Sequence, residues 1–313
     1  MRKAALDMVH ALAREDDRIV FVGSDLGPDT LAEMRTEMPE RFFMEGVSEA
    51  AVIGMAAGLA MDGFIPYVNT IATFITRRCY EQVALDLCLH DLPVRLIGNG
   101  GGLVYAPLGP THLAIEDIAI MRALPNMTVL AVADADEMRR MMRAVRNLPG
   151  PAYVRLGKGG DPVVTGGIED FAIGRAYPLR AAGRVGFVST GVMTARALAA
   201  CELLAARGIE AGVLHMPTVK PLDVEDLLAF AAGTDLLVTA EEHVLTGGLG
   251  SAVLECLADA GRMQRVLRLG IPDRFAAQYG SQESLLALYG LQPDAMAERV
   301  AAALDQPGRP ASA

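Results

Sequence analysis

The sequence predicts an α/β protein of two domains, each built from a parallel sheet with helices on both faces. Short apolar, strand-like runs alternate with helical stretches along the chain, a pattern typical of βαβ units and parallel sheets. The 313 residues suffice for two domains of ordinary size, and 52% of them are hydrophobic, as in a chain with large cores. An irregular stretch divides the alternation, so we expect a first domain over 1–165, a linker over 166–184, a second, smaller domain over 185–305 and a disordered tail over 306–313.

The first block begins with a helix over residues 1–14, where apolar residues recur at helical spacing. Strands are expected where short apolar runs end at turn residues, at 18–23, 65–68, 94–98, 129–131 and 152–156. Helices are expected between these strands, at 49–61, 73–90, 115–123 and 136–147. The second block repeats the pattern, with strands at 185–189, 212–215, 235–240 and 265–269 and helices at 194–207, 224–232, 249–260, 281–289 and 294–304.

Composition excludes several classes of protein. A net charge of -10 argues against a nucleic-acid partner, which needs clustered positive charge. No run of 18 apolar residues would span a membrane, and Asp7 stands where a secretion signal would be apolar. The cysteines are widely spaced and form no C-x-x-C motif, which is typical of reduced core thiols: Cys79, Cys88, Cys201 and Cys256. We therefore expect a soluble, cytoplasmic protein that binds neither nucleic acid nor membrane.

The most informative stretch surrounds Glu49. From Gly46 to Ala60 this glutamate is the single ionisable side chain, and the residues after Ser48, a good helix N-cap, are apolar or small on every face. This pattern predicts a buried helix with a carboxyl group in its first turn, where loss of solvation would raise the carboxyl pKa. One interpretation is a glutamate of capping-box type. The other is an acid kept in apolar surroundings so that it can hand a proton to a ligand.

A second informative stretch is the glycine-rich loop from Asn99 to His112. It follows a predicted buried strand, at the carboxyl end of a parallel sheet, where such folds bind ligands. Its glycines would let the backbone approach a ligand closely, but the Gly-Lys-Ser/Thr ending of a Walker loop is missing. On its own the loop is either a ligand site or a tight turn, and His112 is either functional or simply hydrogen-bonded.

Several pieces taken together, in order and spacing, resemble the transketolase family of thiamine diphosphate enzymes, which includes deoxyxylulose-phosphate synthase. They are Gly23-Ser24-Asp25-Leu26, Gly46-Val47-Ser48-Glu49, Thr73-Phe74, Gly109-Pro110-Thr111-His112, Leu124-Pro125-Asn126-Met127-Thr128 and Thr246-Gly247-Gly248-Leu249-Gly250. The resemblance covers nearly the whole chain. It covers only the C-terminal part of a full-length transketolase, namely the pyrimidine-binding domain and the C-terminal domain.

The resemblance implies a set of cofactor-binding residues. Glu49 matches the glutamate that hydrogen-bonds the aminopyrimidine ring and supplies the proton that activates the cofactor. Asp25 and Leu26 match a segment pressed against the cofactor. Arg77 stands where transketolases usually place a stacking phenylalanine, and its planar guanidinium can also stack. The residues that match the pocket around the pyrimidine are Phe74, Arg77 and Tyr80.

The resemblance also implies substrate-binding residues, with departures. His112 matches a histidine that hydrogen-bonds hydroxyls of the ketose donor. Lys158 and Arg2 match two phosphate-binding arginines. Three positions depart from the family pattern: Leu108 replaces an acceptor-reading aspartate, Gly100 a second histidine, and Asp29 a phosphate-site serine. These changes favour a less polar, unphosphorylated or otherwise unusual acceptor.

Half of the cofactor site is missing from the sequence. In the family, a Gly-Asp-Gly segment followed some 25–30 residues later by Asn holds the diphosphate and Mg²⁺, as the resemblance implies, but this chain has only Met61-Asp62-Gly63-Phe64, and Asn69 follows too soon. We therefore expect no metal site in this chain and a partner subunit that carries the diphosphate-binding domain, in an α2β2 assembly of two-fold symmetry. Small residues would allow close helix packing at a subunit contact or simply fill the core: Ala50, Gly54, Ala57 and Gly58.

The expected function is therefore one half of a split transketolase that transfers a two-carbon ketol unit, or a related acyl unit, from a ketose to an aldehyde through thiamine diphosphate and Mg²⁺. Two alternatives share the cofactor: the beta subunit of a 2-oxo acid dehydrogenase, and a deoxyxylulose-phosphate-synthase-like enzyme with pyruvate as donor. A third is a structural subunit without catalysis.

The segment Glu241-Glu242-His243 looks like a metal or acid–base cluster, but its position at a strand end favours a solvated or interface role.

Overall fold

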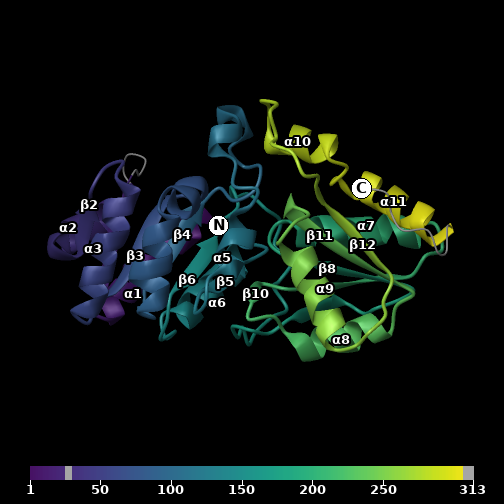
Figure 1. Cartoon of the computed structure of the whole chain (residues 1–313), viewed down its shortest axis with the longest axis horizontal. Helices are drawn as coiled ribbons and strands as arrows, with labels where there is room; N and C mark the ends of the chain where they lie inside the picture. The colour runs from purple at the N-terminus through teal and green to yellow at the C-terminus, as the bar shows by residue number, and fades with distance from the viewer. Residues whose placement is uncertain (25–29, 306–313) are drawn as a thin grey trace.

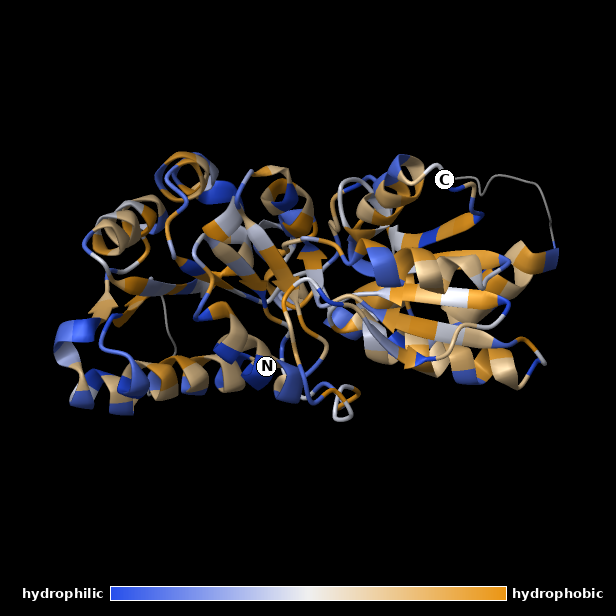
Figure 2. Cartoon of the chain, turned by 90° about the horizontal axis from the view of Figure 1, so that it is seen from below, coloured by the Kyte–Doolittle hydropathy of each residue, from blue (hydrophilic) through white to orange (hydrophobic). Residues whose placement is uncertain are grey.

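The computed structural model describes residues 1–24 and 30–305. Two α/β domains lie side by side along the long axis of the molecule, each around its own sheet (Figure 1). The strands of both sheets are predominantly hydrophobic (Figure 2). The predicted fold class is thus confirmed, although each sheet carries one antiparallel edge strand in addition to its parallel strands.

The first sheet has seven strands in the order β10-β5-β6-β4-β3-β1-β2. Its strands are β1 (Ile19–Gly23), β2 (Phe42–Met44), β3 (Ile65–Ile71), β4 (Arg95–Asn99), β5 (Thr128–Ala131), β6 (Ala152–Arg155) and β10 (Thr218–Lys220). All pair in parallel except β10, which comes from the second half of the chain and runs antiparallel to β5. Every residue of β1, β4 and β6 is buried, which explains why these strands are mainly apolar.

Helices cover both faces of this sheet: α1 (Arg2–Glu15), α2 (Ala32–Glu37), α3 (Glu49–Met61), α5 (Asp117–Ala123) and α6 (Ala135–Val145). The single helix expected over 73–90 is divided into a π-helix η2 (Phe74–Arg78), a short α4 (Tyr80–Gln82) and a second π-helix η3 (Val83–Leu89). Short 3₁₀ turns are η1 (Pro39–Arg41), η4 (Ala106–Leu108) and η5 (Pro110–His112). One face of the sheet buries side chains of α1 and α6, and the other those of α3, η3 and α5.

The second sheet has five strands in the order β12-β11-β8-β9-β7. Its strands are β7 (Tyr177–Arg180), β8 (Val185–Ser189), β9 (Ala211–His215), β11 (Leu236–Val244) and β12 (Val266–Ile271), and its helices are α7 (Met193–Ala205), α8 (Val224–Ala232), α9 (Leu249–Asp259), α10 (Gln282–Leu288) and α11 (Pro293–Asp305). Strand β7 lies inside the stretch expected to be irregular. Its Pro178 is tolerated because β7 is an edge strand, with β9 as its neighbour on one side.

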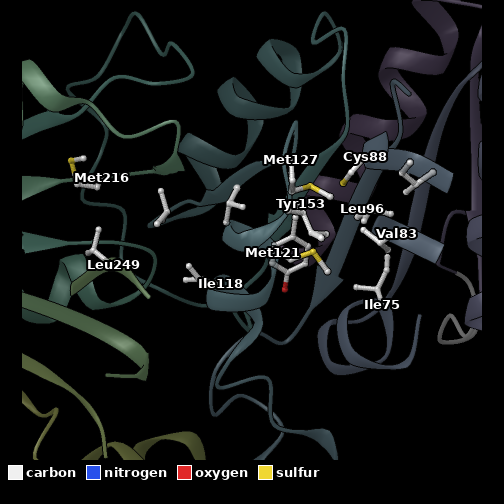
Figure 3. Packing of buried hydrophobic residues seen from close by; sticks show 14 of the residues in the cluster. Ile75, Val83, Cys88, Leu96, Ile118, Met121, Met127, Tyr153, Met216 and Leu249 are labelled. Atoms are coloured by element: carbon white, nitrogen blue, oxygen red, sulfur yellow. The ribbon is translucent and has the colours of Figure 1, made fainter. Parts of the chain in front are cut away.

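One hydrophobic cluster spans both domains. The cluster that contains Ile75 and Leu96 of the first domain continues through Ile118 to Met216 and Leu249 of the second (Figure 3). The seam between the domains is therefore a packed interface, and it fixes the position of the loops that follow the first sheet.

Helix α3 differs from the expectation of burial on every face. Val52, Ile53 and Ala56 are buried, but Gly54 and Gly58 are exposed. A Cβ atom added at either glycine would meet no atom within 4 Å, so this face of the helix is open within the chain. The expectation was wrong for an isolated chain because small residues permit burial but do not specify what covers them.

Two further sequence expectations have structural counterparts. All four cysteines are unpaired and buried, as expected of core thiols. Within residues 1–24 and 30–305, no helix is long and apolar enough to cross a membrane.

Candidate active site

The site residues predicted from the sequence follow the carboxyl ends of neighbouring parallel strands: Glu49 follows β2, Phe74 follows β3, His112 follows β4 and Lys158 follows β6. These strand ends meet at one edge of the sheet, which is where open α/β folds bind ligands. Three other predicted residues, Asp25, Leu26 and Asp29, lie outside the described residues.

Glu49 is the first residue of α3, and its side chain is 2% exposed. Ser48 occupies the N-cap position, but its hydroxyl donates to the carbonyl oxygen of Glu45 at 3.0 Å and does not accept from the helix. Glu49 therefore belongs to no capping box. Its carboxylate instead pairs with Arg78, whose Nη1 lies 2.9 Å from Oε2. The carboxyl group is buried, as the sequence predicts, but its surroundings are not wholly apolar, because η2 brings the cation of Arg78 to it.

Phe74 lies between a guanidinium and an imidazole. The Cζ of Arg78 is 4.1 Å from the centroid of the Phe74 ring, a cation–π distance. On another side, the ring is edge-on to His112, with centroids 5.3 Å apart. The aromatic ring therefore connects Arg78, and through it Glu49, with the histidine of the glycine-rich loop.

Arg77 points to a different partner from its neighbour in sequence. Its Nε lies 3.0 Å from Oε1 of Glu116, and burial raises the pKa of that glutamate. Tyr80 donates its hydroxyl to the carbonyl oxygen of Ile120 at 2.9 Å, which ties α4 to α5. Both contacts fix the segment after β3. A cavity of about 640 Å³ opens beside this segment, lined by Thr73, Phe74, Arg77, Arg78, Pro110, Thr111 and Phe275, so Tyr80 supports the cavity wall without lining it.

The structure explains why position 100 is glycine. Gly100 has φ +71°, and a Cβ atom there would lie 2.2 Å from Cε2 of Tyr105. A histidine at this position would strain the backbone and would require the Tyr105 ring, which fills the space, to move. Further along the loop Leu108 is 49% exposed, and His112 is held by a contact of 2.9 Å between its Nδ1 and the hydroxyl of Thr111.

Arg2 and Lys158 lie apart from the Glu49–His112 group but on the same side of the sheet. A Cβ atom at Gly159 would be 3.3 Å from the backbone nitrogen of Met1, so the start of α1 adjoins the loop that carries Lys158. Both side chains are exposed, and within residues 1–24 and 30–305 neither forms an ion pair. The pair provides positive charge near the carboxyl edge.

The residues around the cavity fit an aromatic heterocycle with hydrogen-bonding nitrogens. Phe74 lines the cavity and offers a ring for stacking, and the lining residue Arg78 is paired with the buried carboxyl group of Glu49. Thr73 is 4% exposed, lines the cavity, and has a hydroxyl oxygen without a hydrogen-bond partner in the described structure. An aminopyrimidine ring is a group of this kind.

A metal-bound diphosphate has no comparable cradle in the described part of the chain. Residues 1–24 and 30–305 contain no group of three or more His, Cys, Asp or Glu side chains that could hold a metal ion. Asp62 is the C-cap of α3, at the opposite edge of the sheet from Glu49. Asn69 is buried, and its amide nitrogen donates to the carbonyl of Ile97 and to the side chain of Asn99.

The segment Glu241-Glu242-His243 is an interdomain contact. All three side chains are buried, so a solvated role is excluded. Glu242 accepts from the backbone N–H of Leu103 at 2.9 Å, and Nε2 of His243 accepts from the backbone N–H of Ala119 at 3.2 Å. Glu241 accepts from two backbone N–H groups at the start of α9. The bonds of Glu242 and His243 hold the glycine-rich loop and α5 of the first domain against the second domain.

Two family models match the chain. The transketolase pyrimidine-binding domain matches residues 1–160, and the transketolase C-terminal domain matches residues 174–296. The chain belongs to the transketolase family. Membership in this family implies a thiamine diphosphate-dependent transferase.

Several relatives are similar over the whole chain. A transketolase family protein of Sinorhizobium fredii is 38% identical over 303 residues, with 95% of this chain and 86% of the relative covered. A 6-deoxy-6-sulfo-D-fructose transketolase subunit of a Clostridium species is 37% identical, with 93% and 90% covered. The 1-deoxy-D-xylulose-5-phosphate synthase 1 of Geobacter sulfurreducens is 40% identical, but this chain spans only 48% of its length.

Solved structures agree with this family. An inactive beta4 tetramer of a split gene transketolase has a TM-score of 0.88 and 37% identity, with 97% of each chain covered. A transketolase of Pichia stipitis has a TM-score of 0.78 at 21% identity, and this chain covers 45% of it, so that comparison shows the fold alone. The chain therefore corresponds to the pyrimidine-binding and C-terminal half of a transketolase.

Proposed function

We propose that this chain is the catalytic beta-type subunit of a split transketolase, which transfers a two-carbon ketol unit from a ketose to an aldehyde acceptor. The observation that carries the proposal is the group at the carboxyl edge of the first sheet, where Arg78 connects the buried carboxyl of Glu49 to the Phe74 ring, and that ring contacts His112. Relatives of similar length are named as transketolase subunits, which supports a split enzyme.

Each residue has a separate task in this proposal. Glu49 would hydrogen-bond the ring nitrogen of the cofactor and exchange a proton with it, and Phe74 would stack against that ring. His112 orients hydroxyl groups of the ketose donor, because its imidazole lies edge-on to Phe74, which lines the cavity. Thiamine diphosphate supplies the carbanion that accepts and releases the two-carbon unit when it is bound.

A partner subunit would complete the site. The described residues offer no cradle for a metal-bound diphosphate, so we assign Mg²⁺ and the diphosphate mainly to a partner that carries the diphosphate-binding domain. The open face of α3 at Gly54 and Gly58 begins one turn after Glu49 and suits close helix packing against that partner. Two-fold symmetry then favours an α2β2 assembly, which we place in the cytoplasm.

The acceptor pocket would favour an unphosphorylated or less polar aldehyde. Leu108 presents an exposed aliphatic side chain at a position where the family usually has an aspartate. Tyr105 fills the space next to Gly100. A second candidate, a deoxyxylulose-phosphate-synthase-like reaction with pyruvate as donor, is favoured by the 40% identity to a synthase of that kind. Assays with a ketose and with pyruvate as separate donors distinguish the two.

The substitution Glu49→Gln tests the catalytic role. With its partner subunit present, the variant complex is expected to assemble normally and to lose ketol transfer by about 100-fold or more, because the amide cannot exchange the required proton. The control is Glu283→Gln, which alters an exposed carboxylate on α10. Full activity of Glu49→Gln in an intact complex would contradict catalysis and favour a structural subunit.

A further inference from the structure

Arg78 is the unexpected neighbour of the predicted cofactor site. It lies at the end of η2, directly after Arg77, and its side chain is 46% exposed. Its guanidinium contacts two of the groups assigned to the pyrimidine ring: Nη1 is 2.9 Å from the Glu49 carboxylate, and Cζ is 4.1 Å from the centroid of the Phe74 ring. The Arg78 side chain therefore covers the ring on which a pyrimidine would stack and is paired with the carboxylate to which it would hydrogen-bond.

A guanidinium is well suited to this position. Like an aminopyrimidine, it is planar, delocalised and rich in nitrogen, and it can stack on an aromatic face while it hydrogen-bonds in its own plane. It also compensates the charge of Glu49, which is 2% exposed and would be costly to leave without a cation. The contact is thus a favourable arrangement that a bound ring has to replace.

The neighbouring charged and titratable groups do not compensate the charge of Glu49. Arg77 is paired with Glu116, and Arg78 is the only cation that pairs with Glu49 among residues 1–24 and 30–305. Cys79, the next residue, is buried, which raises the pKa of its thiol to about 12, with the charge of Glu49 as a second cause. The thiol is therefore neutral, and the Glu49–Arg78 pair stands as an isolated unit.

We propose that Arg78 is a displaceable occupant of the pyrimidine site, which holds Glu49 and Phe74 until the cofactor ring takes its place. This inference rests on the proposed function. Its half-exposed side chain can turn into solvent without unpacking the core, whereas Glu49 on α3 is held at the sheet. The Glu49–Arg78 contact then limits both the rate and the affinity of cofactor binding.

The test compares thiamine diphosphate binding to the complete complex, in Mg²⁺, for wild type and Arg78→Met. If Arg78 occupies the site in about nine of ten molecules, its removal raises the apparent affinity about tenfold. We expect the gain in affinity to come mainly from a faster association rate, which stopped-flow experiments measure. Calorimetry gives the dissociation constant. The matched control is Arg139→Met, which removes an exposed arginine paired with Asp136 and leaves Glu49 untouched. Arg78→Gln is the second variant, which keeps a planar polar group but removes the charge.

The outcomes separate this inference from the proposed function. Tighter and faster binding by either Arg78 variant, with Arg139→Met unchanged, supports displacement. Binding that is unchanged or weaker in a folded Arg78 variant overturns it, and weaker binding would make Arg78 a cofactor ligand. A wild-type complex that binds no thiamine diphosphate contradicts the proposed function itself. A second readout is the melting temperature without cofactor, which we expect to fall in Arg78→Met because Glu49 loses its cation.

Discussion

The ring of Phe74 stands edge-on to the imidazole of His112, with centroids 5.3 Å apart and an interplanar angle of 65°. The contact joins η2, which follows β3, to η5, which follows β4. Edge-to-face pairs of this kind have a preferred geometry, so the ring fixes the direction in which the histidine points. Phe74 is therefore expected to matter for the donor as well as for the cofactor.

The substitution Phe74→Leu tests this link. Leucine keeps the site apolar but loses the edge contact, and a histidine displaced by about 1 Å is expected to lower kcat/KM for the ketose donor by roughly 10- to 100-fold. Steady-state kinetics of the complete complex measure the change. The control is Phe171→Leu, which removes a stacked contact with Tyr177 of β7 and should leave kcat/KM unaltered. Equal kinetics for both variants would refute the role assigned to the ring.

The open face of α3 gives a second prediction. Gly58 is exposed in the middle of the helix, so Gly58→Ala should raise the free energy of unfolding of the chain alone by about 0.5–1 kcal/mol through helix propensity. Gly58→Leu should also fold, because the added side chain meets no neighbour. It should nevertheless weaken assembly with the partner subunit, measured by analytical ultracentrifugation.

The control for the α3 face is Ala302→Leu, which adds the same bulk to an exposed position of α11. This variant is expected to assemble like wild type. If Gly58→Leu assembles equally well, the small residues of α3 do not form the subunit contact.

The buried pair Glu241 and His243 predicts opposing effects of pH on stability. Burial raises the pKa of Glu241 to about 7 from 4.5 and lowers the pKa of His243 to about 4 from 6.5. The glutamate binds more protons in the folded state, so its contribution falls as pH rises from 4.5 to 7. The histidine binds fewer, so its contribution falls as pH drops from 6.5 to 4. Between pH 4.5 and 6.5 the two slopes nearly cancel in the wild type.

Single substitutions reveal each slope. In His243→Gln, the free energy of unfolding should decrease by about 3 kcal/mol relative to wild type from pH 4 to pH 6.5, because the opposing contribution of His243 is removed. In Glu241→Gln it should increase by a similar amount relative to wild type from pH 4.5 to pH 7, because the contribution of Glu241 is removed. Urea unfolding of the full chain across this range measures both. Parallel pH profiles for the two variants would show that burial does not shift these groups in opposite directions.

Much of the fold was predictable because the determining signals are local. The apolar run of β4 and the small, apolar helix after Ser48 specify their elements without knowledge of their neighbours. Strands β2, β7 and β10 were not predicted, since each is short and is defined by pairing with another strand. Glu49, Phe74 and His112 were recognised from motifs, and the structure brings them together through contacts of Arg78 and Phe74.

Other features of the site depend on tertiary geometry. Arg78 was missed because Arg77 and Arg78 are equivalent in sequence, and only the π-helical turn sends one to Glu116 and the other to Glu49. The fit of Tyr105 against Gly100 also needs the folded loop. The arginine doublet after Thr73-Phe74 was the available signal, because a buried acid at the same edge of the sheet requires a cation as partner.

The departures in the acceptor pocket predict substrate preference. With Leu108 in place of an aspartate, the complex should use an unphosphorylated aldehyde with a kcat/KM at least equal to that for its phosphorylated counterpart. Glyceraldehyde and glyceraldehyde 3-phosphate, assayed with one donor, provide the comparison. Lys158→Met should change the ratio little, because the exposed cation then has no phosphate to bind. A clear preference for the phosphorylated acceptor would refute this view of the pocket.

The most direct test of the account is thiamine diphosphate binding to this chain, to its co-purified partner subunit, and to the mixture. We expect tight, Mg²⁺-dependent binding only in the mixture, because this chain supplies Glu49 and Phe74 while the described residues hold no metal cluster for the diphosphate. Tight binding to this chain alone would contradict the split site. The absence of binding in all three samples would mean that the family fold is present without its chemistry.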